Sequence, residues 1–233
     1  MPLTIPSFIR RSNIADEPVT HSWDDDDPEY AYAGMDERLQ HRMDGTTDRG
    51  VLALSAGFAE WILWRFSKQS SDPLLLNKIE AMWAGIVDWR YLSPLRMPPA
   101  HEWRGPVRGP IWSAANWLDR IVDLLKRREF ATPEAVALSQ LMLHVIAHPD
   151  AFKNWRRFAI QRLDKLYPST EQDLLGRPVP REALNPDIKY DPATASALID
   201  TYLRGLDPSL NPFLAKPADM VVAGFTGTPY TYP

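Results

Sequence analysis

Cysteine is absent from this 233-residue sequence, which excludes disulfide bonds, thiolate metal sites and a cysteine nucleophile. Long apolar runs are also missing. No apolar stretch of about 7–15 residues follows a basic start at the N-terminus, as a secretory signal requires. No segment reaches the roughly 18 uninterrupted apolar residues of a membrane span either. We therefore expect no membrane partner and a cytoplasmic location.

Catalytic signatures are equally scarce. Ser55 lies within a predicted helix, whereas the nucleophile of an α/β-hydrolase sits at a strand-to-helix elbow. No glycine-rich phosphate loop follows a predicted strand. The sequence therefore predicts no cofactor and favours a protein that is not an enzyme.

Two histidines offer a weak exception. His144 and His148 are spaced i, i+4 in a predicted helix, a spacing that puts both imidazoles on one side and can hold a metal ion. The zincin pattern would place glutamate directly after the first histidine, where this sequence has Val145. The structural interpretation is that His148 lies beside an apolar stripe and that both groups stabilise the helix C-terminus.

Helix starts are the clearest positive signal. A capping residue stands before proline or an apolar helical run at Asp72-Pro73, Gly109-Pro110, Thr132-Pro133, Asp150-Ala151 and Asp191-Pro192. Aspartate or threonine accepts a free backbone N–H there, and proline at the first helical position loses only a donor that has no partner. With the apolar spacing, these signals predict helices over residues 35–43, 46–69, 73–89, 110–128, 132–148, 150–167 and 192–204.

These helices predict an all-α fold. We expect one irregular bundle of about six to eight helices over residues 35–206, and no internal repeat is visible. The segment 46–69 is apolar on several faces, which predicts a central helix. The 45% hydrophobic and 24% charged content is typical of a chain that folds into a globular domain.

Proline-rich segments flank and interrupt this bundle. Residues 1–34 are interpreted as an acidic N-terminal arm and residues 207–233 as a C-terminal arm packed on the body. Residues 93–110 contain five prolines and two glycines, which argues against a helix or a central strand. The segment is then a long ordered loop or a flexible linker, and the apolar anchors Met97, Trp103 and Val107 favour the ordered loop. Such long loops are uncommon in compact domains and are often functional.

Acidic residues are concentrated near the N-terminus, since residues 1–50 hold eleven acidic and five basic side chains. The densest run comprises Asp24, Asp25, Asp26, Asp27 and Glu29. It lacks the alternating oxygens and the glycine of a calcium loop. Two main interpretations remain, a solvated run or a binding element for a basic surface, and a metal site is a third.

The loop at 93–110 carries the other candidate binding residues, which are Arg96, Trp103, Arg104 and Arg108. Guanidinium groups bind phosphate or carboxylate in a bidentate manner, so these arginines could hold a partner. Alternatively, they tie the loop to acids of the same molecule. The net charge of −4 argues against nucleic acid as the partner.

Two functions follow from these observations. The first is a non-catalytic interaction protein, most concretely a bacterial immunity or inhibitor protein that neutralises or escorts a toxin or effector with a basic surface. The acidic run and the nine tryptophans, a residue type enriched at binding hot spots, favour it. The alternative is a metal-dependent helical hydrolase that uses His144, His148 and a carboxylate.

Overall fold

The computed structural model describes residues 3–32, 34, 36–94 and 97–232. These residues form nine α-helices, six short 3-10 helices and no strand, which confirms the all-α prediction. The α-helices are α1 (Ser7–Arg11), α2 (Glu37–Met43), α3 (Asp48–Arg65), α4 (Leu74–Gly85), α5 (Gly105–Lys126), α6 (Thr132–Val145), α7 (Asp150–Leu166), α8 (Ala195–Arg204) and α9 (Pro217–Val222). None of these helices has both the length and the apolar character needed to cross a bilayer.

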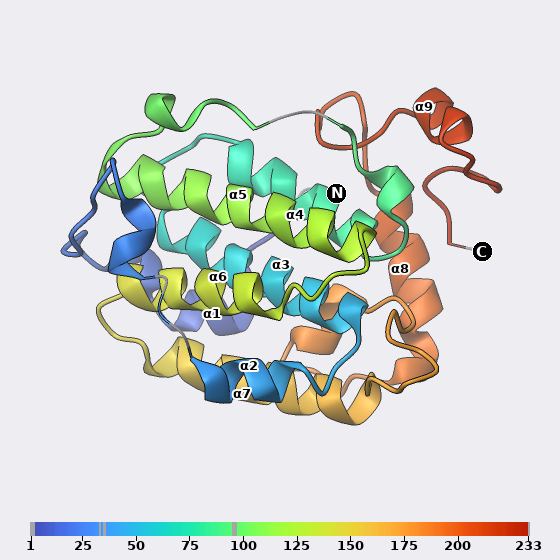
Figure 1. The fold of residues 1–233 in the computed structure, drawn as a ribbon, viewed down its shortest axis with the longest axis horizontal. Coiled ribbons are helices and arrows are strands. Elements are labelled where there is room, and N and C mark those ends of the chain that lie inside the picture. Colours follow the sequence, from blue (N-terminus) through green and yellow to red (C-terminus); the bar gives the residue numbers. More distant parts are fainter. Residues whose placement is uncertain (1–2, 33, 35, 95–96, 233) are drawn as a thin grey trace.

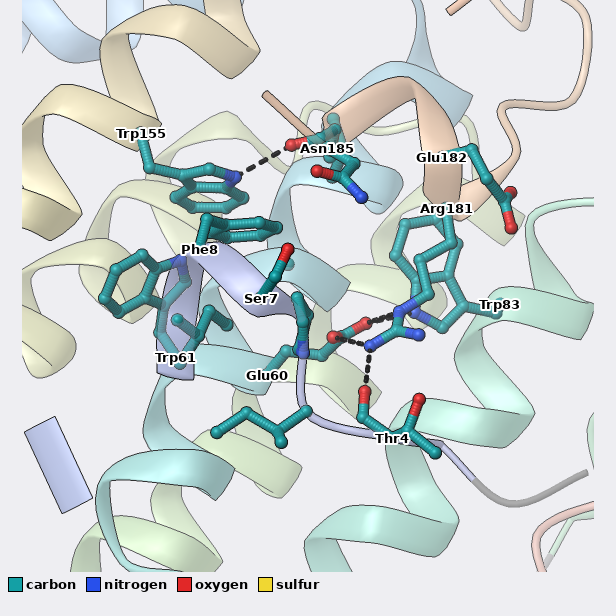
Figure 2. Close-up of a pocket in the computed structure, with 15 residues that line it drawn as sticks. Thr4, Ser7, Phe8, Glu60, Trp61, Trp83, Trp155, Arg181, Glu182 and Asn185 are labelled. Carbon is teal, nitrogen blue, oxygen red and sulfur yellow. Dashed lines mark hydrogen bonds and ion pairs between the residues drawn. The ribbon is translucent and has the colours of Figure 1, made fainter. Parts of the chain in front are cut away.

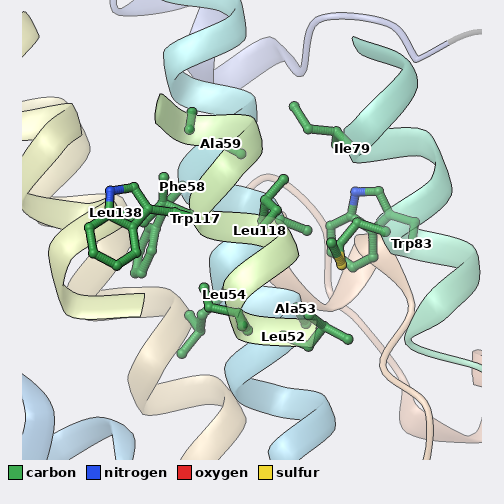
Figure 3. Close-up of a cluster of buried hydrophobic side chains, with 14 of the residues drawn as sticks. Leu52, Ala53, Leu54, Phe58, Ala59, Ile79, Trp83, Trp117, Leu118 and Leu138 are labelled. Carbon is green, nitrogen blue, oxygen red and sulfur yellow. The ribbon is translucent and has the colours of Figure 1, made fainter. Parts of the chain in front are cut away.

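Helix α3 is the centre of the bundle and contacts α4, α5, α6 and α7. In Figure 1, α5 and α6 lie in front of α3, α2 and α7 run along the lower edge, and α8 stands on the right. Most of α3 is buried, including Ala53, Leu54 and Phe58, which are fully enclosed. The prediction of a central helix is thus confirmed, and Figure 3 shows its side chains packed against Ile79, Trp83, Trp117, Leu118 and Leu138 from the surrounding helices.

The caps explain where several helices begin. The Thr47 side chain accepts a hydrogen bond from the Gly50 amide at the start of α3, and Asp36 accepts one from Leu39 at the start of α2. Asp72 accepts one from the Leu74 amide, the first residue of α4. Each bond satisfies a backbone donor that the helix itself leaves without a partner.

Helix α5 begins earlier than the sequence analysis predicts. Residues 105–110 form the first turns of this helix, so the predicted loop at 93–110 is wrong over its last six residues. Pro106 lies in the first turn, where a missing N–H costs nothing. Pro110 lies deeper and supplies no N–H for the Pro106 carbonyl, which accepts a hydrogen bond from His21 Nε2 at 2.9 Å instead. A side chain from a distant segment thus compensates for the second proline.

Both terminal segments pack on the bundle. From the N-terminal segment, Leu3, Ile9 and Ile14 are buried in the common hydrophobic core, and α1 lies within this segment. At the other end, the Ala215 amide donates to the Tyr91 carbonyl at 2.8 Å. The two segments therefore contribute to the core of the bundle.

Candidate functional site

The acidic turn, defined here as residues 24–27, has a fixed conformation at the surface. The Asp24 Oδ1 atom accepts hydrogen bonds from the Asp26 amide at 2.9 Å and the Asp27 amide at 3.3 Å. This arrangement is an Asx-type turn, in which one aspartate side chain organises the backbone that follows it. The Asp26 side chain is 90% exposed. The turn therefore presents the Asp26 carboxylate to solvent from an ordered backbone, whereas the Asp25 side chain is only 27% exposed.

The start of α5 holds the acidic turn in place. The Asp25 carboxylate accepts a hydrogen bond from the Gly105 amide at 2.7 Å, where the helix dipole favours a negative charge. Arg104 Nε lies 3.4 Å from Asp25 and its Nη2 lies 3.0 Å from Asp26. The structure therefore brings two of the predicted acidic residues together with one of the predicted arginines, within the same chain. Glu29 contacts Arg120 of α5 at 3.3 Å.

An aromatic contact lies next to the turn. The Trp23 ring stacks on the Tyr32 ring, with centroids 6.1 Å apart and planes at 13°. A Cβ atom at Gly109 would lie 2.1 Å from Trp23 Nε1, so only glycine lets this ring lie against α5. The glycine that the sequence analysis interprets as a helix start instead admits a packed tryptophan.

The remaining loop residues lie in different settings. Trp103 is buried, with 8% of its surface exposed, and the Arg108 guanidinium lies 4.6 Å from the centre of its ring. Arg96 lies outside the described residues. Trp103 therefore offers a partner little surface of its own, whereas Arg104 is more than half exposed.

The two histidines of the predicted metal pair do not share a helix face. Helix α6 ends at Val145, because Pro149 has no N–H for the Val145 carbonyl and its ring would clash with that carbonyl, so His148 lies beyond the helix. His144 Nε2 donates to the Ser22 carbonyl at 2.7 Å, and His148 Nδ1 donates to Glu17 at 3.2 Å. Among the described residues, no group of three or more histidine, aspartate or glutamate side chains could hold a metal ion.

Glu17 and Arg65 fasten the N-terminal segment to the bundle, a role that the sequence analysis missed. The Glu17 carboxylate accepts hydrogen bonds from the Ala147 amide at 2.8 Å and the His148 amide at 3.3 Å. The buried Arg65 guanidinium donates to the Val145 carbonyl and to the Pro18 carbonyl, both at 2.9 Å. These bonds satisfy backbone groups at the end of α6 and hold the chain that leads to the acidic turn.

Stability should depend on pH through His21. Burial lowers the pKa of this imidazole, the neighbouring His144 and Arg65 lower it further, and the bond to Pro106 opposes the shift. A histidine in the unfolded chain has a pKa of about 6.5, so below that pH the unfolded state binds more protons. The free energy of unfolding should then fall with decreasing pH, by at most about 1.4 kcal/mol per pH unit from this group. We expect His21→Gln to weaken this dependence in urea titrations at several pH values, and an unchanged dependence would exclude His21 as its source.

A cavity of about 270 Å³ lies between α1, α3, α4 and α7 and is drawn in Figure 2. Four aromatic side chains line it, and we call it the aromatic cavity. These are Phe8 of α1, Trp61 of α3, Trp83 of α4 and Trp155 of α7. Residues 4–9 and 181–185 supply much of the remaining wall. Gly57 makes room for this wall, since a Cβ atom there would lie 2.8 Å from the Trp155 ring.

A buried ion pair forms one end of the aromatic cavity. Glu60 is 3% exposed, and its carboxylate accepts hydrogen bonds from Arg181 Nε at 2.8 Å and Arg181 Nη2 at 2.6 Å. Trp83 Nε1 donates to the same carboxylate at 2.8 Å. Burial by itself lowers the pKa of Arg181, but the charge of Glu60 and its hydrogen bonds raise the pKa above its ordinary value. Arg181 also donates to the Thr4 carbonyl at 2.9 Å, which ties the N-terminal segment to this site.

The sequence held one signal for this cavity. Glu60 is an acidic residue inside the apolar helix predicted to be central, and a buried acid needs a charged or hydrogen-bonding partner. Its partner Arg181 lies in a proline-rich connection 121 positions away, and nothing in the local pattern marks it.

Comparisons of the chain with protein-family models, with curated proteins and with solved structures found no match.

Proposed function

We propose that this chain is a non-catalytic binding protein of the inhibitor or immunity type, which neutralises or escorts a partner protein through the acidic turn and Glu29. The observation that supports the proposal is the fixed, exposed conformation of residues 24–27. A partner with a basic surface fits this turn by charge. The proposal takes its specific form, an immunity protein, by functional analogy.

The fixed conformation matters because binding has an entropic cost. A flexible segment loses conformational freedom when a partner orders it, and a segment that is already ordered loses less. The Asp24 side chain, the Gly105 amide and Arg104 hold this turn before any partner arrives. Binding energy from its carboxylates would then contribute to affinity.

The local charge also favours a basic partner. The five carboxylates of residues 24–27 and Glu29 face two guanidinium groups, those of Arg104 and Arg120, which leaves a formal net charge of −3. Such a cluster steers a basic protein during diffusional encounter. The attraction weakens as salt is added, because the Debye length is about 8 Å at physiological ionic strength.

The partner can be obtained by affinity capture with the tagged chain in the source organism, and binding can then be followed by surface plasmon resonance. Replacing all four aspartates of the turn with asparagine should reduce the association rate at low salt by at least about tenfold. Asparagine retains the Oδ1 acceptor, so the hydrogen bonds of Asp24 and Asp25 can persist and the fold should be kept. The salt dependence of the rate should also decrease.

A matched control neutralises the same number of exposed acids elsewhere, with Glu37→Gln, Asp44→Asn, Glu171→Gln and Asp219→Asn. This variant has the same net charge as the first, so its association rate should stay near that of the native chain. If the turn variant left the association rate unchanged, or if the control reduced it equally, the acidic turn would not be part of the interface.

A further inference from the structure

The aromatic cavity has flat walls of a size that suits a small ring system. The Phe8 and Trp155 rings are stacked, with centroids 6.0 Å apart and planes at 9°. The Trp61 ring lies 5.7 Å from Trp155 and is tilted by 47°. A volume of about 270 Å³ is just below the range of about 300–1,000 Å³ in which ligand pockets usually fall. The space therefore favours a small aromatic molecule over a long chain.

One hydrogen-bond donor in this wall has no acceptor. Trp61 is 1% exposed, and its Nε1 atom is buried without a partner. The indoles of Trp83 and Trp155, by contrast, donate to Glu60 and to the Leu184 carbonyl. Leaving a buried donor unsatisfied costs about 1–3 kcal/mol. An acceptor that reached Trp61 would recover part of this free energy.

Phe8 controls access to this donor. Figure 2 shows the Trp61 nitrogen turned toward the Phe8 ring. Phe8 is only half-buried and belongs to the five-residue helix α1. A second cavity of about 240 Å³, lined by Phe8, Trp61, Trp155 and Phe158, adjoins it and provides space into which the ring can swing. A ligand that accepts a hydrogen bond from this donor must therefore displace the Phe8 ring.

The charge of the cavity favours an uncharged ligand. Glu60 and Arg181 neutralise each other at one end, and Figure 2 shows the Glu182 carboxylate directed away from the aromatic rings. A charged ligand would lose its hydration here without gaining a counter-ion. A hydrogen-bond acceptor on a neutral ring has a smaller desolvation cost, which a hydrogen bond from a buried donor can offset.

We propose that the aromatic cavity binds a small, flat, uncharged aromatic molecule that carries a hydrogen-bond acceptor, and that this acceptor takes the Trp61 Nε1–H. This binding site is separate from the acidic turn. It does not depend on the partner protein, so the two proposals can fail independently.

The test uses a pair of probes of the same shape. Isoquinoline is flat, is uncharged at neutral pH and has one acceptor nitrogen, whereas naphthalene has no acceptor. Each is titrated into the full ¹⁵N-labelled chain, and the indole N–H signals are followed by NMR. We expect the Trp61 signal to shift with isoquinoline, and isoquinoline to bind at least about tenfold more tightly than naphthalene, the effect of about 1.4 kcal/mol. The Trp112 and Trp117 N–H groups, which are already hydrogen-bonded and do not line the cavity, serve as internal references.

Two variants distinguish the effect of the Trp61 N–H donor from the effect of its aromatic ring. Trp61→Phe keeps an aromatic ring but removes the N–H, so the preference for isoquinoline should disappear while naphthalene binding remains. Trp64→Phe removes another buried indole N–H without a partner, one that does not line the cavity, and should change neither affinity. Equal binding of the two probes, a Trp61 signal that does not move, or a preference that survives Trp61→Phe would each overturn the proposal.

Discussion

Replacing Glu60 with alanine should lower the free energy of unfolding by about 3–5 kcal/mol, the usual cost of breaking a buried ion pair by removing one partner. Glu60 is 3% exposed and accepts three hydrogen bonds, two from Arg181 and one from Trp83. The substitution leaves the Arg181 guanidinium, whose side chain is only 25% exposed, without its counter-ion. Equilibrium unfolding in urea measures the loss.

A double-mutant cycle tests whether the ion pair is the cause. If it is, Glu60→Ala and Arg181→Ala combined should cost clearly less than the sum of the two single changes, because each alone leaves an unpaired group. Arg204→Ala provides a control, since it breaks an ion pair with Asp200 that lies at the surface and should leave stability nearly unchanged. Additive losses in the cycle would show that Glu60 acts through packing and not through Arg181.

The helices could be predicted largely from local sequence because their signals are local. Apolar spacing and a cap such as Thr47 lie within a few residues of the helix that they define. The central position of α3 was predictable for the same reason, since a helix that is apolar on several faces packs against several neighbours. Where a boundary depends on a distant segment, the prediction was wrong. Helix α5 extends back to Gly105 because His21, 85 positions away, donates to the Pro106 carbonyl.

The candidate sites also differ in whether their residues are close together in the sequence or come from distant segments. The acidic turn was visible as a run of like charges, because its members are consecutive in the sequence. The aromatic cavity could not be seen in the sequence, because it combines residues from four helices and two other segments. For His144 and His148, the sequence showed the spacing but not the distant groups that bind them. Their spacing implied a shared face, but Glu17 and the Ser22 carbonyl, both from the N-terminal segment, bind them separately.

Trp61→Ala and Trp83→Ala should each lower the free energy of unfolding by about 3–5 kcal/mol, the range for truncation of a buried large aromatic side chain. The two side chains are 1% and 3% exposed. Trp61 packs on Phe152 at 5.5 Å, so its removal opens a void between α3 and α7. Trp83 also donates to Glu60, so its loss leaves the buried carboxylate one donor short.

The control for these truncations is Trp89→Ala, because Trp89 is 49% exposed and its removal opens no internal void. We expect its effect on stability to stay within about 0.5 kcal/mol. All three variants can be compared by urea unfolding with circular dichroism as the probe. The phenylalanine variants of Trp61 and Trp83 should lose less than the alanine variants, because a ring remains to fill the space. If the losses at 61 and 83 were as small as at 89, these tryptophans would have to lie at the surface, and the core assignment of α3 and α4 would be wrong.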